Sequence, residues 1–173
     1  MGVVRDAVIA WMYEKRCYNP VSKDIFWSLL VVAETYEGCL SDINGFHIKR
    51  DHVFAALDGA SGGPVTEGNM EGGTGMICHG FKGGVGTSSR EINIDESLCT
   101  VGVLVQANYG SRRNLIIASV PVGEVEGQTP IYHSEEGDSS SIIVIAATNA
   151  PLLPPQLKQL ARRTPLDIAR VGE

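Results

Sequence analysis

Apolar side chains recur at helical spacing near the start of the chain and again near residue 50. The first set consists of Val4, Ala7, Val8, Trp11 and Met12. On a helix these side chains would share one face, with the charged residues on the other, which predicts an amphipathic helix. A second, shorter helix is predicted over residues 50–57, with Asp51 as its N-cap and Gly59 as its terminator.

Several apolar runs read as strands rather than helices. Residues 27–33 (WSLLVVA) form a continuous apolar run, which predicts a buried strand. Residues 100–108 alternate, so that Leu104, Gln106 and Asn108 share one face. Further strands are predicted over residues 114–123 and 141–147, and a helix follows with Pro155 at its first position.

The predicted strands outnumber the helices, and the helices lie towards the two ends. This order predicts an α/β fold, a layered sandwich with mixed or antiparallel sheets, built as a single domain over residues 1–173. A length of 173 residues can bury a core, and 43% hydrophobic with 20% charged residues is typical of a globular chain. No apolar run reaches the length that a bilayer requires, so we expect no membrane association.

Charge and cysteine usage narrow the possible partners and cofactors. The net charge of −6 and the scattered basic residues argue against nucleic acid as a partner. The four cysteines are far apart, so we expect no metal site and no cofactor. Reduced thiols and the lack of a secretory signal pattern at the start favour a cytoplasmic location.

A glycine-rich region separates the two halves of the chain, with 11 glycines between Gly59 and Gly86. It contains neither GxGxxG nor GxxxxGK[ST], so nucleotide binding through such loops is not supported. Glycine at this density is typical of tight turns and of backbones that approach each other closely.

Three consecutive serines, the last of them Ser141, lead into the strand predicted at residue 141, in the stretch EEGDSSSIIVIAATNAPLLP. A serine hydroxyl needs a base and an oxyanion donor to act as a nucleophile. No GxSxG elbow surrounds any serine, which leaves a Ser-His-Asp enzyme weakly supported. Alternatively, the hydroxyl attacks the preceding carbonyl, and hydrolysis of the resulting ester frees an N-terminal serine whose α-amine, with a pKa of about 8, can accept a proton. From composition alone, a solvated loop before a strand is the simpler interpretation.

Five stretches, in order, carry a resemblance that covers nearly the whole chain: VVAETYEGCLSDINGFH, HVFAALDGASGGPVTEGN, GGTGMICHGFKGGVGTSSR, TVGVLVQANYG and SIIVIAATNAPLLPPQLKQLARR. Together they resemble the L-aminopeptidase/D-esterase family, also called the DmpA-type or β-aminopeptidase family, peptidase family S58. The resemblance implies a self-cleaving N-terminal-nucleophile hydrolase with an αββα sandwich. It also implies removal of N-terminal residues from small peptides, amides or esters, and assembly as a homo-oligomer or with a complementary chain.

Carried over residue by residue, the resemblance implies roles for five positions. Ser141 is the nucleophile, and self-cleavage between Ser140 and Ser141 divides the chain into residues 1–140 and 141–173. Asn108 donates its side-chain amide to the oxyanion, a suitable role for a fixed, uncharged group at a strand end. Glu34 holds the substrate ammonium, and the Tyr36 phenol assists with proton or oxyanion handling.

Two departures from the family pattern keep other interpretations open. Relatives carry Gly or Asn before the nucleophile, whereas Ser140 stands here, which predicts slowed or blocked self-cleavage and leaves Ser140 as a second candidate nucleophile. The family's further catalytic serine and glutamate follow the region of resemblance, so the chain is expected to be the central part of a longer member, incomplete at both ends.

Two other functions therefore remain possible. The chain is a non-catalytic, uncleaved remnant or assembly subunit of the family, or it is an acyltransferase similar to the ornithine acetyltransferases. The ornithine acetyltransferases use a threonine nucleophile, so the serine at position 141 argues against the acyltransferase function.

Overall fold

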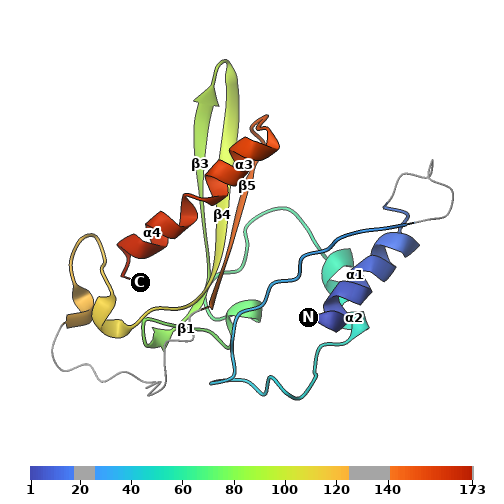
Figure 1. Ribbon diagram of the computed structural model, residues 1–173, viewed down its shortest axis with the longest axis horizontal. Helices are drawn as coiled ribbons and strands as arrows, with labels where there is room; N and C mark the ends of the chain where they lie inside the picture. Colours follow the sequence, from blue (N-terminus) through green and yellow to red (C-terminus); the bar gives the residue numbers. More distant parts are fainter. Residues whose placement is uncertain (18–25, 125–140, 173) are drawn as a thin grey trace. The chain divides into compact units, whose positions relative to one another are not determined.

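The computed structural model describes residues 1–17, 26–124 and 141–172 (Figure 1). The chain divides into two compact units. Unit 1 consists of Met1–Glu34 with Asp42–Pro64, and unit 2 consists of Thr35–Ser41 with Val65–Glu173.

Two helices form unit 1, and both were predicted. α1 spans Gly2–Glu14 and α2 spans Arg50–Asp58, with Ala7 and Val53 as their buried residues. α2 ends at Gly59 as expected, whereas its N-cap is Lys49 and Asp51 lies in the first turn. The side chain of Asp58 joins the two helices, because it accepts a hydrogen bond from the Trp11 indole (2.9 Å) and pairs with the Lys15 ammonium (2.8 Å).

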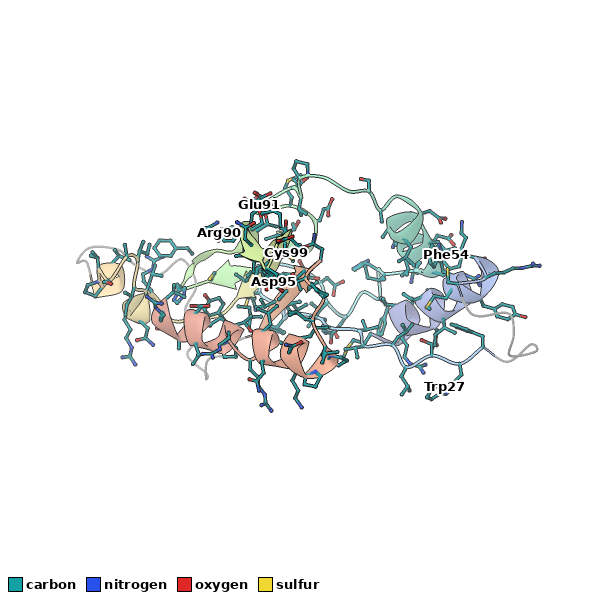
Figure 2. The ribbon with its side chains drawn as sticks, turned by 90° about the horizontal axis from the view of Figure 1, so that it is seen from above. Trp27, Phe54, Arg90, Glu91, Asp95 and Cys99 are labelled. Atoms are coloured by element: carbon teal, nitrogen blue, oxygen red, sulfur yellow. The ribbon has the colours of Figure 1, made fainter. Side chains whose placement is uncertain are left out.

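The strand predicted over residues 27–33 is wrong. The segment has no regular secondary structure, and no strand of the described chain pairs with it. Three of its side chains are largely exposed, namely Trp27 (76%), Leu29 (76%) and Val31 (94%). Figure 2 shows Trp27 at the margin of unit 1. A continuous apolar run predicts burial on both faces, but here alternate side chains face solvent.

A three-stranded antiparallel sheet is the centre of unit 2. Its order is β3 (Gly84–Ile94), β4 (Ser97–Asn108) and β5 (Ser141–Thr148), with β4 in the middle. β5 pairs only with residues 101–108 of β4, so the end of the β3–β4 hairpin extends beyond it (Figure 1). The predicted strands at 100–108 and 141–147 are confirmed, and the alternation along β4 sets which side chains share a face.

A small hairpin lies beside β4 and leads into β3. β1 (Ile77–Cys78) and β2 (Phe81–Lys82) pair antiparallel, and η1 (Glu71–Gly73) precedes them. The Lys82 ammonium donates hydrogen bonds to three backbone carbonyls, those of Gly73, Met76 and Gly83, at 2.8–3.0 Å. Burial lowers the pKa of Lys82, while these carbonyls bind its charged form.

The strand predicted over residues 114–123 is also wrong. The segment contains η2 (Arg112–Asn114) and η3 (Val122–Glu124). Between them Ile117 and Val120 bridge each other across Ala118 and Ser119, both of which have positive φ. An apolar composition typical of strands is therefore interrupted by a tight turn, which Ala and Ser rarely signal in a sequence.

After β5 the chain forms α3 (Pro154–Ala161) and α4 (Thr164–Arg170), which follow one side of the sheet in both views (Figures 1 and 2). The described architecture is α/β with antiparallel sheets, as predicted. The single-domain arrangement stays a prediction. None of the helices in the described ranges is long and apolar enough to cross a membrane.

Candidate active site at the start of β5

Ser141 and Asn108 face each other across two paired strands. Ser141 is the first residue of β5, Asn108 is the last residue of β4, and the two are direct partners in the antiparallel register. Directly opposite residues of an antiparallel pair project from the same face of the sheet. The two predicted catalytic side chains, 33 positions apart in sequence, therefore meet at one end of the sheet.

Two N–H groups point at the Ser141 hydroxyl oxygen. The Asn108 amide nitrogen donates to Oγ over 3.0 Å, and the backbone N–H of Tyr36 donates to it over 2.8 Å. Neither donor carries a charge that would need a counter-ion. A pair of fixed dipoles at this position can stabilise negative charge on or beside Oγ.

The orientation of the Asn108 amide is fixed at its other end. Its Oδ1 accepts a hydrogen bond from the backbone N–H of Ile77 in β1, at 2.8 Å. This contact requires the oxygen to face β1 and leaves the nitrogen to face Ser141. The side chain is only 6% exposed, so water does not compete for either end.

The structure brings the backbone of Tyr36, rather than its phenol, to the nucleophile. The ring is 46% exposed and turns back over its own loop, where a Cβ added at Gly38 would lie 2.5 Å from the phenol oxygen. The role expected for the phenol stays a prediction, and the N–H group at this position is a contact that side-chain reasoning missed.

A small buried network supports the segment that carries Tyr36. The Thr35 hydroxyl donates to the Met76 sulfur over 3.0 Å and accepts a hydrogen bond from the Gln106 amide. Gln106 lies two residues before Asn108, on the same face of β4. Thr35 is 8% exposed and Met76 is 1% exposed. These contacts attach the Tyr36 segment to the strand that carries Asn108.

The other two predicted site residues are Glu34 and Ser140. Glu34 belongs to unit 1, where its carboxylate lies 3.8 Å from the Met1 ammonium. Ser140, and with it the predicted scissile bond, lies outside the described residues. Within the described ranges no three His, Cys, Asp or Glu side chains are grouped as a metal site would require.

Comparison with known proteins identifies relatives along the whole chain. Residues 1–173 match peptidase family S58. The β-peptidyl aminopeptidase BapA of Sphingosinicella microcystinivorans is 45% identical over 185 residues, which cover 100% of this chain and 45% of that protein. BapA of Sphingosinicella xenopeptidilytica is also 45% identical, over 99% of this chain and 44% of its own length. The chain thus spans about half the length of the curated relatives it matches.

Solved structures agree with the sequence matches. The L-aminopeptidase D-Ala-esterase/amidase of Ochrobactrum anthropi, described as a variant of the Ntn hydrolase fold, superposes with a TM-score of 0.84 and 46% identity. A Burkholderia sp. β-aminopeptidase gives 0.82 and 48%. Each alignment covers 99% of this chain and 45–46% of the other. The predicted Ntn-type α/β fold is thereby confirmed, and with a match over every residue the chain belongs to peptidase family S58.

Proposed function

We propose that this chain carries the nucleophile of a self-processing serine aminopeptidase or amidase that releases N-terminal residues from small peptides, amides or esters. One observation carries the proposal: the Ser141 hydroxyl, at the first residue of β5, accepts hydrogen bonds from both Asn108 and Tyr36. The names of the relatives, which are aminopeptidases and an esterase/amidase, agree with this chemistry.

The first step is cleavage of the chain by its own serine. The Ser141 Oγ attacks the carbonyl carbon of residue 140, and its proton passes to the departing nitrogen of Ser141. The C–N bond breaks and an ester forms between residue 140 and Oγ. Water then hydrolyses this ester, which gives a carboxylate on residue 140 and a free α-amine and hydroxyl on Ser141.

The second step uses the new terminus. The free α-amine, with a reference pKa of about 8, accepts the proton of Oγ as Oγ attacks the substrate carbonyl. The Asn108 amide and the Tyr36 N–H, both of which donate to Oγ in the structure, are the donors that we assign to the developing oxyanion. The leaving amine takes the proton, and water hydrolyses the acyl-serine to release the acid.

Substrate recognition is assigned to Glu34. A carboxylate is the group that would bind the free ammonium of an N-terminal residue, through charge-assisted hydrogen bonds. The Glu34 side chain is 63% exposed, so a substrate ammonium can reach it. Glu34→Gln is expected to raise KM more than it lowers kcat.

Intact-mass spectrometry of the purified protein tests self-cleavage directly. We expect two fragments that meet between Ser140 and Ser141, and a single uncleaved chain in Ser141→Ala. Ser89→Ala, an exposed serine of β3, is the matched control and should cleave normally. Hydrolysis of aminoacyl p-nitroanilides should disappear only in Ser141→Ala. Cleavage and hydrolysis that survive in Ser141→Ala would refute the proposal.

The residue before the nucleophile gives the test a second arm. Because Gly reaches positive φ freely, Ser140→Gly should accelerate cleavage. Fragments one residue longer and shorter than expected would instead identify Ser140 as the nucleophile. A single 18.5 kDa species in both the unaltered and the Ser140→Gly proteins would favour an uncleaved assembly subunit.

A further inference from the structure

We infer that His79 is a positioning residue, which holds the Asn108 amide in the orientation that donates to Ser141. The inference rests on the proposed function, because it concerns the same site. His79 is 4% exposed and lies in the turn of the β1–β2 hairpin. Both residues of this turn have a left-handed backbone, with φ of 49° at His79 and 69° at Gly80.

The hairpin that His79 closes carries one of the two contacts of Asn108. Ile77, two residues before His79, donates its N–H to Oδ1 at 2.8 Å. β1 has only two residues, so the position of this N–H depends closely on the turn. A shift of the hairpin would move the Ile77 N–H away from Oδ1. The contact that fixes the orientation of the Asn108 amide would then be lost.

His79 also binds the backbone that follows Asn108. Its own N–H donates to the Tyr109 carbonyl at 2.8 Å, and its Nδ1 lies 3.2 Å from the Ser111 carbonyl oxygen. A carbonyl oxygen only accepts, so Nδ1 carries the proton in this contact. The imidazole meets the Tyr109 ring edge-on, with centroids 5.1 Å apart. The turn after β4 is thus attached to the hairpin at three points.

Gly110 makes this close packing possible. Its φ is +81°, and a Cβ at this position would lie 2.3 Å from Cε1 of the imidazole. The ring therefore lies directly against the backbone two residues after Asn108. Among the described residues, the His79 Nε2 is buried without a hydrogen-bond partner, which is unfavourable for a polar atom. A ring kept there despite this penalty is consistent with a role in fixing geometry.

The consequence concerns the transition state in particular. If Ile77 or the Tyr109 turn moves, the amide can rotate and present oxygen instead of nitrogen to Ser141. An oxygen there repels the negative charge that develops during attack, yet it leaves the binding of the substrate ammonium unaffected. Loss of His79 should therefore lower kcat and the rate of self-cleavage while KM stays nearly constant.

Two substitutions separate the ring from the backbone conformation. His79→Gly removes the ring without strain at positive φ, and should lower kcat and the self-cleavage rate by roughly 10–100-fold, as a misplacement of about 1 Å does. His79→Asn tolerates the same φ and offers an amide N–H in place of Nδ1–H, so it should retain most of the rate. His47→Gly, at an exposed histidine of unit 1, is the matched control.

A spectroscopic measurement separates this inference from the proposed function. The NMR signals of the Asn108 side-chain amide, recorded in the Ser141→Ala background, should be sharp and distinct. They should shift or broaden in His79→Gly and in Gly110→Ala, which displaces the ring independently, but not in His47→Gly. Unchanged amide signals in either folded variant would overturn the role of His79. An inactive, uncleaved protein with the expected NMR changes would refute only the proposed function.

Discussion

The oxygen and the nitrogen of the Asn108 side-chain amide have different hydrogen-bond partners. The oxygen accepts from Ile77, and the nitrogen donates to Ser141. Asn108→Asp keeps the shape and the acceptor but loses the donor. We expect kcat to fall roughly 10²–10³-fold, about 3–4 kcal/mol of transition-state stabilisation. Single-turnover hydrolysis assays would measure this.

A second asparagine supplies the control for that prediction. Asn149 Oδ1 accepts from the Thr100 N–H at 2.7 Å, so Asn149→Asp also retains its acceptor. It lies outside the candidate site and should leave kcat unchanged. An Asn108→Asp enzyme as active as Asn149→Asp would contradict the assigned oxyanion role.

At the scale of single residues, the sequence identified side chains but not backbone donors. Asn108 and Ser141 were found from the family motifs, and the alternation along β4 correctly placed Asn108 at a strand end. The N–H groups of Ile77 and Tyr36 carry no side-chain signal. His79 has positive φ, which is uncommon for a non-glycine residue, and only the adjacent Gly80 indicates this turn in the sequence.

At the scale of elements, a carboxylate holds the glycine-rich segment to β3. Glu67 accepts hydrogen bonds from the Thr87 hydroxyl and from the Thr87 N–H, the latter at 2.8 Å. Both hydrogen bonds lower the pKa of Glu67 from its ordinary value of 4.5, and the one from the Thr87 hydroxyl has the larger effect. Next to it, Gly68 and Val85 exchange two backbone hydrogen bonds of 2.8 Å each.

The direction of that pKa shift predicts how stability depends on pH. A folded-state pKa below the unfolded value stabilises the fold above about pH 4.5, and this contribution is lost as the pH falls through the folded-state pKa. The melting temperature should therefore fall less steeply in acid for Glu67→Gln than for the unaltered chain. Glu91→Gln, an exposed glutamate of β3, is the control. Parallel acid profiles for Glu67→Gln and the unaltered chain would disprove this account.

Element prediction succeeded where periodicity was local and failed where burial depends on other segments. α1, α2, β4 and β5 follow their sequence patterns. Residues 27–33 carry the composition of a buried strand, yet the described chain provides them with no pairing strand. Strand pairing is a long-range property, so composition alone does not decide it.

At the scale of the whole molecule, apolar side chains extend along the face of the sheet that carries the site. Ile143 and Ile145 follow Ser141 on this face, and Leu104 lies opposite Ile145. Ile145 is 55% exposed, and Ile143 and Leu104 are half-buried. Contiguous apolar faces of this kind are typical of surfaces that another layer or chain covers.

We therefore expect the purified chain to associate, either with a further copy or with a complementary chain, through this face. Light scattering should report a mass above 18.5 kDa. Ile145→Lys should lower that mass, because a buried ammonium without a partner is strongly unfavourable. Asn93→Lys adds the same charge to the same face of the sheet, on the part of the hairpin that extends beyond β5, and should leave the mass unchanged. An unaltered chain that remains a monomer, with its secondary structure intact by circular dichroism, would show that this face needs no cover.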